Sequence, residues 1–286
     1  MIKSCSLVLA LLLTGISLAA CGGEAADGER GAPIAVPADA TPAATTPAPA
    51  GTESPTGADA SIEPDQAAEV APRTNRYRMT DAFRFVPTEE GIAEKAVLLT
   101  FDDGPKDEAV LRSMLDTLDK HKAKAIFFVN GYRVKQNPEL LKLIHEREHA
   151  IGNHSWDHID LKKESEETVE RQIGDLQAEV ESLIGEKPLF FRPPYGSGGD
   201  VVRRIAKNHG MLYMTWSNGS LDWDRSARDK PEEVIRNVLE QLHPGANILM
   251  HELPWTADAL DELLTRLTGK GYAFIDPGEI EVDVTR

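Results

Sequence analysis

The fold is decided by one stretch of the sequence, Ala96-Val97-Leu98-Leu99-Thr100-Phe101-Asp102-Asp103-Gly104-Pro105. It opens with an almost unbroken apolar run, which is typical of a strand buried on both faces of a parallel sheet. Consecutive strand residues point to opposite faces, so Asp102 and Asp103 can share a site only if the chain turns at once, and Gly104-Pro105 supplies that turn. Two carboxylates converging there would repel each other and attract a cation. The alternative is an Asp-Asp-Gly turn without function.

Further apolar runs follow along the chain, and segments with helical spacing separate them. The runs cover residues 125–129, 189–191, 211–216, 247–251 and 272–274. The segments with helical spacing cover residues 110–118, 140–144, 169–183, 231–242 and 257–267. This alternation predicts a mostly parallel α/β sheet or barrel, with the reacting groups at the carboxyl ends of its strands. Residues 77–286 have a length that suits one domain.

Two histidines four residues apart follow the run at residues 151–153, in His154-Ser155-Trp156-Asp157-His158. They would lie on one face if the segment made a helical turn, as in other His-x-x-x-His metal sites. His145 and His149 have the same spacing, but Lys142 and Arg147 beside them indicate a solvated helix end. The later pair, at the exit of a strand, is therefore the better candidate for metal binding.

Three other motifs also follow apolar runs. Arg192-Pro193-Pro194-Tyr195-Gly196 is a stiff loop, because each proline fixes its own φ and restricts the residue before it. It could hold a guanidinium or a backbone N–H in place, or it could be no more than a rigid connector. Asp222-Trp223 and His251 are weak signals singly.

Composition excludes several classes of function. The chain has 286 residues, with 47 acidic against 31 basic side chains and a net charge of −16, which argues against a nucleic-acid binder. A mean hydropathy of −0.33 is too polar for a protein with many membrane spans. Cys5 and Cys21 are the only cysteines, so the chain beyond residue 21 has no disulfide, thiolate metal site or cysteine nucleophile.

The N-terminus resembles a bacterial lipoprotein signal. Lys3 is followed by an apolar stretch at residues 7–13 that is short for a membrane span, and then by Leu18-Ala19-Ala20-Cys21. The resemblance implies a signal peptide over residues 1–20 and a lipidated Cys21. The alternative is a transmembrane anchor that ends near Ala20.

The next segment is expected to be a disordered acidic linker over residues 21–76. Of the 51 residues from 22 to 72, 36 are Ala, Pro, Thr, Gly or Ser, and such a composition cannot bury enough apolar area to offset the ordering entropy. The expected location is therefore extracytoplasmic, with the chain held at a bacterial membrane by its lipid anchor.

Five motifs taken in order, Thr100 to Gly104, His154 to His158, Arg192 to Gly196, Asp222-Trp223 and Leu249-Met250-His251, resemble those of the polysaccharide deacetylases. That family is carbohydrate esterase family 4, also called the NodB-homology domain. The resemblance covers roughly residues 96–274. It implies an α/β fold, a distorted (β/α) barrel with fewer than eight full units as a single catalytic domain over residues 77–286. It also implies a divalent-metal hydrolase that removes N-acetyl groups from amino sugars.

The resemblance also assigns a role to each motif position. The metal ligands would be Asp103, His154 and His158. The general base would be Asp102, fixed by Arg192, and the general acid would be His251, oriented by Asp222. Substrate would meet the backbone N–H of Tyr195, the loop at Pro193, and an acetyl pocket walled by Trp223 and Leu249. Two positions depart from the family pattern: Gly219 stands where a further acidic residue is usual, and Glu252 stands where Asp is common.

The expected cofactor is one divalent metal ion, with zinc as the default and cobalt, nickel or manganese as alternatives. The expected partners are an acetylated amino-sugar polysaccharide, with peptidoglycan N-acetylglucosamine first, and the membrane; no protein partner and no nucleic acid are implied. The alternatives are an O-acetyl esterase acting on xylan-like polymers and a deacetylase of chitin or exopolysaccharide. A glycan-binding lipoprotein with a dead site is disfavoured, because every catalytic motif position is filled.

Overall fold

The computed structural model describes residues 74–282. The predicted signal peptide, the lipidation site Cys21 and nearly all of the predicted linker lie outside the described residues. Within the described range, no helix combines the length and the apolar character that crossing a bilayer requires.

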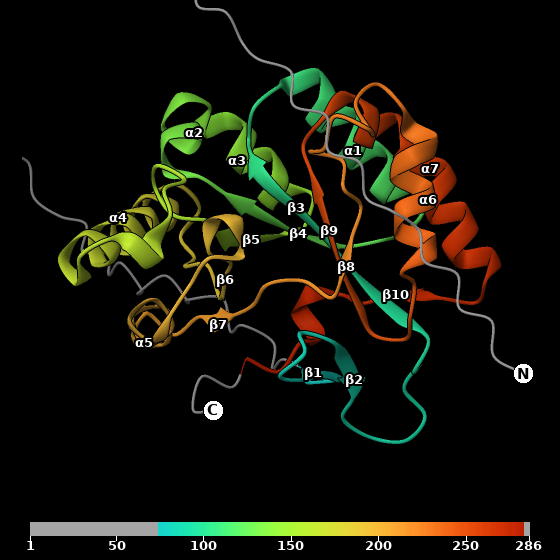
Figure 1. Ribbon diagram of the computed structural model, residues 1–286, viewed down its shortest axis with the longest axis horizontal. Helices are drawn as coiled ribbons and strands as arrows, with labels where there is room; N and C mark the ends of the chain where they lie inside the picture. Colours follow the sequence, from blue (N-terminus) through green and yellow to red (C-terminus); the bar gives the residue numbers. More distant parts are fainter. Residues whose placement is uncertain (1–73, 283–286) are drawn as a thin grey trace, which may run out of the picture. The chain divides into compact units, whose positions relative to one another are not determined.

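A parallel sheet forms the framework, with the strand order β7-β6-β5-β4-β3-β9-β8 and with β10 paired to the start of β3 (Figure 1). Its strands are β3 (Ala96–Gly104), β4 (Ala125–Val129), β5 (Ala150–Asn153), β6 (Phe190–Phe191), β7 (Leu212–Tyr213), β8 (Asn218–Gly219), β9 (Ala246–His251) and β10 (Ala273–Phe274). Each predicted apolar run contains a strand, although β6, β7 and β10 are shorter than their runs. β8 has no apolar run and was not predicted.

The two ends of this strand order, β7 and β8, are consecutive in the sequence. Only residues 214–217 join them, yet neither strand pairs with the other. The sheet therefore curves round until its two edges approach each other, and it forms a half-barrel left open between β7 and β8. This confirms the expected α/β fold, a distorted (β/α) barrel.

Helices cover the outside of the sheet. They are α1 (Glu108–Lys120), α2 (Gly131–Gln136), α3 (Pro138–Glu146), α4 (Glu166–Ile184), α5 (Asp200–Asn208), α6 (Pro231–Glu240) and α7 (Pro254–Gly269). Figure 1 shows α1, α6 and α7 gathered on one flank, and α2, α3 and α4 on the other. Short 3₁₀ turns add η1 (Leu161–Lys163), η2 (Pro194–Gly196) and η3 (Pro277–Glu279). The apolar spacing predicted five of these helices and missed α2 and α5, although Val202, Ile205 and Ala206 of α5 are buried at helical spacing.

The long strand β3 separates two apolar cores. Val97, Leu99 and Phe101 pack with α1, α6 and α7 in the outer core. Ala96 and Leu98 instead join an inner core. Strands β1 (Tyr77–Met79) and β2 (Phe85–Pro87) form an antiparallel hairpin that contributes buried aromatic rings to the inner core. The hairpin closes the end of the half-barrel at which β3 begins. Because strand residues alternate between faces, the next inward positions after Leu98 belong to Thr100 and Asp102.

A β-bulge, and not the Gly-Pro turn, brings the two adjacent aspartates to one site. The register of β3 against β4 passes from Asp102 opposite Phe128 directly to Gly104 opposite Val129, so Asp103 is the extra residue. Asp103 has a φ of 68°, and a bulge with left-handed backbone re-aims a side chain. The change of chain direction that was inferred at Gly104-Pro105 therefore begins at Asp103.

The interpretation of His149 as part of a solvated helix end is wrong. Helix α3 ends at Glu146, and His149 lies just before β5, only 3% exposed, with its Nδ1 accepting a hydrogen bond from the backbone N–H of Ala125. Burial lowers the pKa of His149 to about 4. The polar residues beside His145 and His149 indicated an exposed segment, but the chain turns inward after Glu148.

We expect His149 to make the fold sensitive to acid. Its folded pKa lies below the value of about 6.5 in an unfolded chain, so its contribution is fully present above that pH and is lost as pH falls towards 4. The variant His149→Asn keeps a hydrogen-bond acceptor for Ala125 and should remove about 2 kcal/mol of the fall in unfolding free energy between about pH 7 and about pH 4.5. Urea unfolding across this range measures the difference, with His145→Asn as the matched control. An unchanged fall in His149→Asn would contradict the assignment.

Candidate active site

Arg192 is fully buried at the centre of the half-barrel, just beyond the carboxyl end of β6. Its Nη1 donates to Asp102 Oδ1 at 2.7 Å and to Thr100 Oγ1 at 2.8 Å. Its Nη2 donates to the carbonyl of Thr215 at 2.9 Å and to Asn247 Oδ1 at 3.1 Å. The guanidinium thus ties β3 and β9 to the segment between β7 and β8, across the opening of the barrel.

Asp102 and His251 occupy opposite positions on the neighbouring strands β3 and β9. Asp102 is 3% exposed and gives Oδ1 to Arg192, which leaves Oδ2 directed at the site, 3.6 Å from His154 Nε2. The charge-assisted hydrogen bond from the buried guanidinium holds the carboxylate in one orientation. The structure therefore puts a fixed carboxylate and an imidazole on the two sides of one cleft.

His251 is oriented by Asp222, which is fully buried. The two Asp222 oxygens accept hydrogen bonds from His251 Nδ1 at 2.8 Å, from the backbone N–H of His251 at 2.7 Å and from Thr256 Oγ1 at 2.7 Å. Burial lowers the pKa of His251, but the charge and hydrogen bond of Asp222 outweigh burial, with help from Asp102 and Asp103, so the pKa lies above its ordinary value. An imidazole that keeps its proton near neutral pH can act as a general acid through Nε2.

Asp103, His154 and His158 converge with one ligand atom each, and these atoms lie within 4.8 Å of one another. Asp103 Oδ1 is 3.1 Å from His158 Nε2 and 3.5 Å from His154 Nε2. Burial raises the pKa of Asp103, but its contacts with the two imidazoles outweigh burial and hold that pKa far below its usual range. A carboxylate and two imidazoles in this arrangement are a ligand set for a divalent cation.

The ring orientation of His154 also suits a metal ligand. Its Nδ1 lies 2.7 Å from the carbonyl of Arg192, and only a protonated nitrogen can bond a carbonyl oxygen. The neutral ring then carries its lone pair on Nε2, which is the atom that faces Asp103.

The turn between the two histidines is not helical, contrary to the condition stated for the His-x-x-x-His pattern. Ser155 and His158 have left-handed φ values of 67° and 55°. Side chains hold the turn instead: Asn130 Nδ2 donates to the carbonyl of His154, and Gln172 bonds both the backbone N–H and the carboxylate of Asp157. Asp157 therefore belongs to the support of the turn and not to the metal ligands.

The remaining predicted residues form the walls of the cleft. Tyr195 has a φ of 60° in η2, is 67% exposed and packs its ring edge-on to His158 with centroids 4.7 Å apart. Trp223 is 47% exposed and lies 5.2 Å from the ring of His251. Pro193 and Leu249 are buried below these rings. The cleft thus has exposed aromatic rings on both sides of the histidines.

The two departures from the family pattern have distinct environments. Gly219 is buried in β8, and a Cβ there would meet the rings of Trp223 and Trp216 at ordinary contact distances. Glu252 is buried, and its Oε1 accepts hydrogen bonds from the backbone N–H groups of Lys106 and Asp107. Burial raises the pKa of Glu252 against these two bonds. Glu252 therefore fixes the loop that follows Asp103.

Sequence reasoning missed several residues that support the site, Thr100, Asn130, Gln172, Asn247 and Thr256, and it named Glu252 only as a departure from the family pattern. Each is 8% exposed or less and bonds to a predicted site residue or to its loop. Thr100 and Asn247 carried a faint signal, because each is a polar residue inside or beside an apolar run. Asn130, Gln172 and Thr256 lie on helices or in loops, where a polar residue is common and gives no signal in the sequence.

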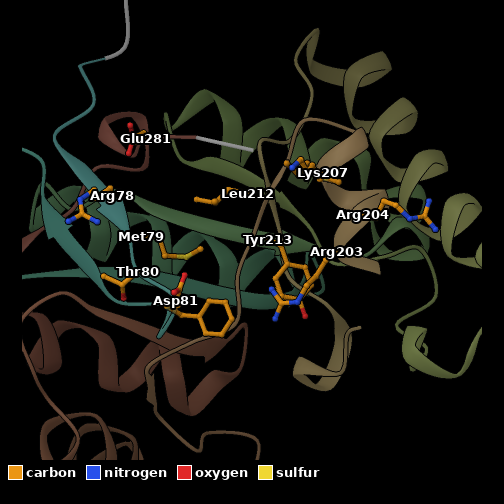
Figure 2. Close-up of a pocket in the computed structure, with 12 residues that line it drawn as sticks. Arg78, Met79, Thr80, Asp81, Arg203, Arg204, Lys207, Leu212, Tyr213 and Glu281 are labelled. Atoms are coloured by element: carbon orange, nitrogen blue, oxygen red, sulfur yellow. The ribbon is translucent and has the colours of Figure 1, made fainter. Parts of the chain in front are cut away.

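Cavity size does not single out this site. A cavity of about 670 Å³ lies elsewhere, between β1, α5 and β7, where Tyr213 and Arg203 face Met79 and Asp81 (Figure 2). None of the residues that line it belongs to the five motifs. The reacting groups border a smaller cavity of about 250 Å³, which Asp103 and His251 both line.

A parallel half-barrel with these five motifs at its carboxyl edge is the arrangement of a polysaccharide deacetylase. Residues 90–214 match the family model for polysaccharide deacetylase. The chain belongs to this family.

Two curated relatives and one solved structure give the degree of similarity. The peptidoglycan-N-acetylglucosamine deacetylase PgdA of Listeria monocytogenes is 37% identical over 215 residues, 74% of this chain and 44% of that protein. The peptidoglycan-N-acetylmuramic acid deacetylase PdaA of Bacillus subtilis is 33% identical over 68% of this chain and 73% of that protein. A carbohydrate esterase family 4 pseudoenzyme from Bacillus anthracis matches with a TM-score of 0.62 and 32% identity over 66% of each chain. The chain thus spans less than half the length of the Listeria relative.

We expect the variant Asp222→Asn to lower the pKa of His251. The substitution removes the charge that outweighs burial, so burial then dominates. An NMR pH titration of labelled histidine Cε1 measures the change, and thermal unfolding checks that the variant folds. Asp261→Asn, on the exposed face of α7, is the matched control. A pKa of His251 that did not move in Asp222→Asn would show that Asp222 only positions the ring.

Proposed function

We propose that the chain removes N-acetyl groups from the amino sugars of an extracytoplasmic glycan, with peptidoglycan N-acetylglucosamine as the first candidate. The observation that carries the proposal is the pairing of Asp102 and His251 across β3 and β9, beside the cluster of Asp103, His154 and His158. An amide is a poor electrophile and an amine a poor leaving group. Their hydrolysis near neutral pH needs a base for water, an acid for nitrogen and a stabiliser of the carbonyl oxygen.

The cluster of three ligands fits a divalent metal ion. Asp103 Oδ1 is buried and has no hydrogen-bond partner among the described residues, and a cation between it and the two Nε2 atoms would satisfy it. Three protein ligands are the number that catalytic zinc sites use, so zinc is the first choice, followed by cobalt, nickel or manganese. When bound, such an ion polarises a carbonyl oxygen and lowers the pKa of water.

The protein residues would divide the proton transfers between them. Asp102, held by Arg192, would take a proton from the attacking water through Oδ2. His251 would deliver a proton from Nε2 to the amine nitrogen as the C–N bond breaks, and Asp222 would stabilise the imidazolium before that step. General acid and general base catalysis contribute roughly 10²–10⁴-fold each. The backbone N–H of Tyr195 is proposed to face the developing oxyanion.

Two groups of alternatives use the same residues. An O-acetyl esterase or a deacetylase of chitin or exopolysaccharide would need the same base, acid and cation. A dead glycan-binding protein is the more distant alternative. The related pseudoenzyme shows that such members exist, and one of its mutants is described as having restored enzymatic activity. Against that alternative, Asp102, Asp103, His154, His158, Arg192 and His251 are all present and meet in one cleft.

The proposal predicts loss of acetyl groups from purified peptidoglycan and from N-acetylglucosamine oligomers. Mass spectrometry before and after treatment measures it, and acetylated xylan is the comparison substrate. Release of acetate from xylan alone would favour the esterase. No release from any of these substrates by the metal-loaded protein would contradict the proposal.

We expect the two groups of site residues to fail in different ways. Asp102→Asn should abolish turnover and keep the metal, because Asp102 is bound to Arg192. His154→Ala with His158→Ala should lose both the metal and turnover. Asp157→Asn is the matched control within the same motif, because that carboxylate bonds to Gln172. Metal analysis and acetate release are measured on each variant. Loss of metal in Asp102→Asn would show that the roles of the two aspartates are exchanged.

We further propose that the chain is a lipoprotein anchored at Cys21 outside the cytoplasm. The composition of the 51 residues from 22 to 72 predicts a coil-like reach on the order of 40 Å, which would let the catalytic domain act on a shell of cell wall near the membrane. Metabolic labelling with a fatty acid should mark the wild-type protein and Cys5→Ala but not Cys21→Ala. Label retained in Cys21→Ala would contradict lipidation at this residue.

A further inference from the structure

The cavity of about 250 Å³ beside the reacting groups has an unusual lining. Asp103 and His251 form one part of its wall, so whatever fills it lies next to the scissile bond of a bound substrate. The rings of Trp223 and Trp255 form another part, and flat aromatic faces suit the apolar faces of sugar rings.

Three cationic side chains line the rest of this cavity. Lys106 comes from the loop after β3, and Arg225 and Arg228 come from the loop after β8. Two acids line the same cavity, Asp103 and Asp224, and Lys106 Nζ lies 3.7 Å from Asp103 Oδ2. The two arginines are therefore the cationic groups that a ligand can meet first, and guanidinium groups select for a negatively charged group on the ligand.

The two arginines are available to a ligand. Both are exposed, and Arg225 makes no hydrogen bond or ion pair within residues 74–282. Arg228 has one weak ion pair, with its neighbour Asp229 at 3.9 Å. Asp224, which lines the cavity together with Asp103, accepts hydrogen bonds from the backbone N–H and the Oγ of Ser226. Asp224 thereby stabilises the turn that carries the arginines.

The loop that carries the arginines is itself fixed. Ala227, between Arg225 and Arg228, is fully buried in the outer core, and its backbone N–H donates to the carbonyl of Asp224. Trp255 Nε1 donates to the carbonyl of Asp222 at 2.8 Å, which ties the start of α7 to the same loop. The two arginines are therefore exposed side chains on a loop whose backbone is held in place.

We propose that Arg225 and Arg228, with Lys106, form a subsite for a carboxylate carried by the glycan, next to the acetamido group that is hydrolysed. This inference rests on the proposed function and narrows its substrate. A guanidinium binds a carboxylate through two parallel hydrogen bonds, and an ammonium adds a point charge. Polymers of N-acetylglucosamine alone and acetylated xylan backbones carry no carboxylate. The subsite therefore favours a glycan that contains muramic acid.

Two sources of the carboxylate share this chemistry. One is the lactyl ether of a muramic residue, which is free when no peptide is attached. The other is a carboxylate of a peptide linked to that ether. Three oligomers of equal length distinguish them: a neutral N-acetylglucosamine oligomer, an oligomer with free lactyl groups, and an oligomer whose lactyl groups carry the peptide.

The test compares the wild-type protein with the double variant Arg225→Gln and Arg228→Gln on these three oligomers. We expect kcat/KM on the anionic oligomers to fall by roughly tenfold or more, through KM, because hydrogen bonds to charged groups are lost. On the neutral oligomer kcat/KM should be unchanged. The matched control is Arg112→Gln with Arg266→Gln, which changes the net charge equally on α1 and α7, away from the cavity.

Each outcome decides the inference. A loss on one or both anionic oligomers, with the neutral oligomer unchanged, supports the subsite, and a loss confined to one of them identifies its source of carboxylate. An equal loss on all three oligomers, or no loss on either anionic one, overturns it. Equilibrium binding of the same oligomers is measured in parallel. If the wild-type protein releases acetate from none of them, the proposed function fails, while a preference for the anionic oligomers that Arg225→Gln with Arg228→Gln removes would still establish the subsite.

Discussion

The buried guanidinium of Arg192 is the constraint on which the rest of the site depends. A charged group with no exposed surface is costly unless it is paired and hydrogen-bonded, and four oxygens from three segments of the chain meet its two terminal nitrogens. Only its Nε–H has no hydrogen-bond partner among residues 74–282. The ring of Phe128, with its centroid 4.3 Å from the guanidinium carbon, supports its remaining face. These bonds cross the gap where β7 and β8 do not pair. One side chain thus closes the half-barrel and fixes the carboxylate of Asp102.

On the other side of the cleft, one buried side chain again positions a reacting group. Asp222 bonds the ring and the backbone of His251 and the hydroxyl of Thr256, so one buried carboxylate joins the end of β9 to the start of α7. The two catalytic candidates are therefore held in equivalent ways: each directs one atom at the cleft and bonds a buried partner, Arg192 or Asp222, with its other atom. Positioning of this kind limits the motion of the reacting groups before substrate arrives.

Much of this arrangement could be predicted from the sequence, because parallel strands bring their carboxyl ends to one edge. Any polar residue that follows an apolar run is then a neighbour of the others, which is why Asp102, His154, Arg192 and His251 could be grouped without a structure. The predictions failed for local conformations that leave no repeating pattern of residues in the sequence. The bulge at Asp103, the non-helical turn of Ser155 and the inward turn before His149 depend on contacts with Asn130, Gln172 and Ala125. Those partners are remote in sequence and carry no motif of their own.

Strained backbone is concentrated where the candidate site needs it. Nine of the described residues other than glycine have left-handed φ values, and five of them, Asp103, Ser155, His158, Tyr195 and Leu221, are proposed functional residues or neighbours of one; the other four are Phe83, Lys122, Glu148 and Asp229. Such conformations cost of order 1–3 kcal/mol each, so the surrounding structure must impose them. At the turn from His154 to His158, the imposing contacts are hydrogen bonds of Asn130 and Gln172, which the motifs do not include. The family motifs therefore supply the reacting atoms, and the unmarked polar residues behind them supply the backbone geometry that lets those atoms meet.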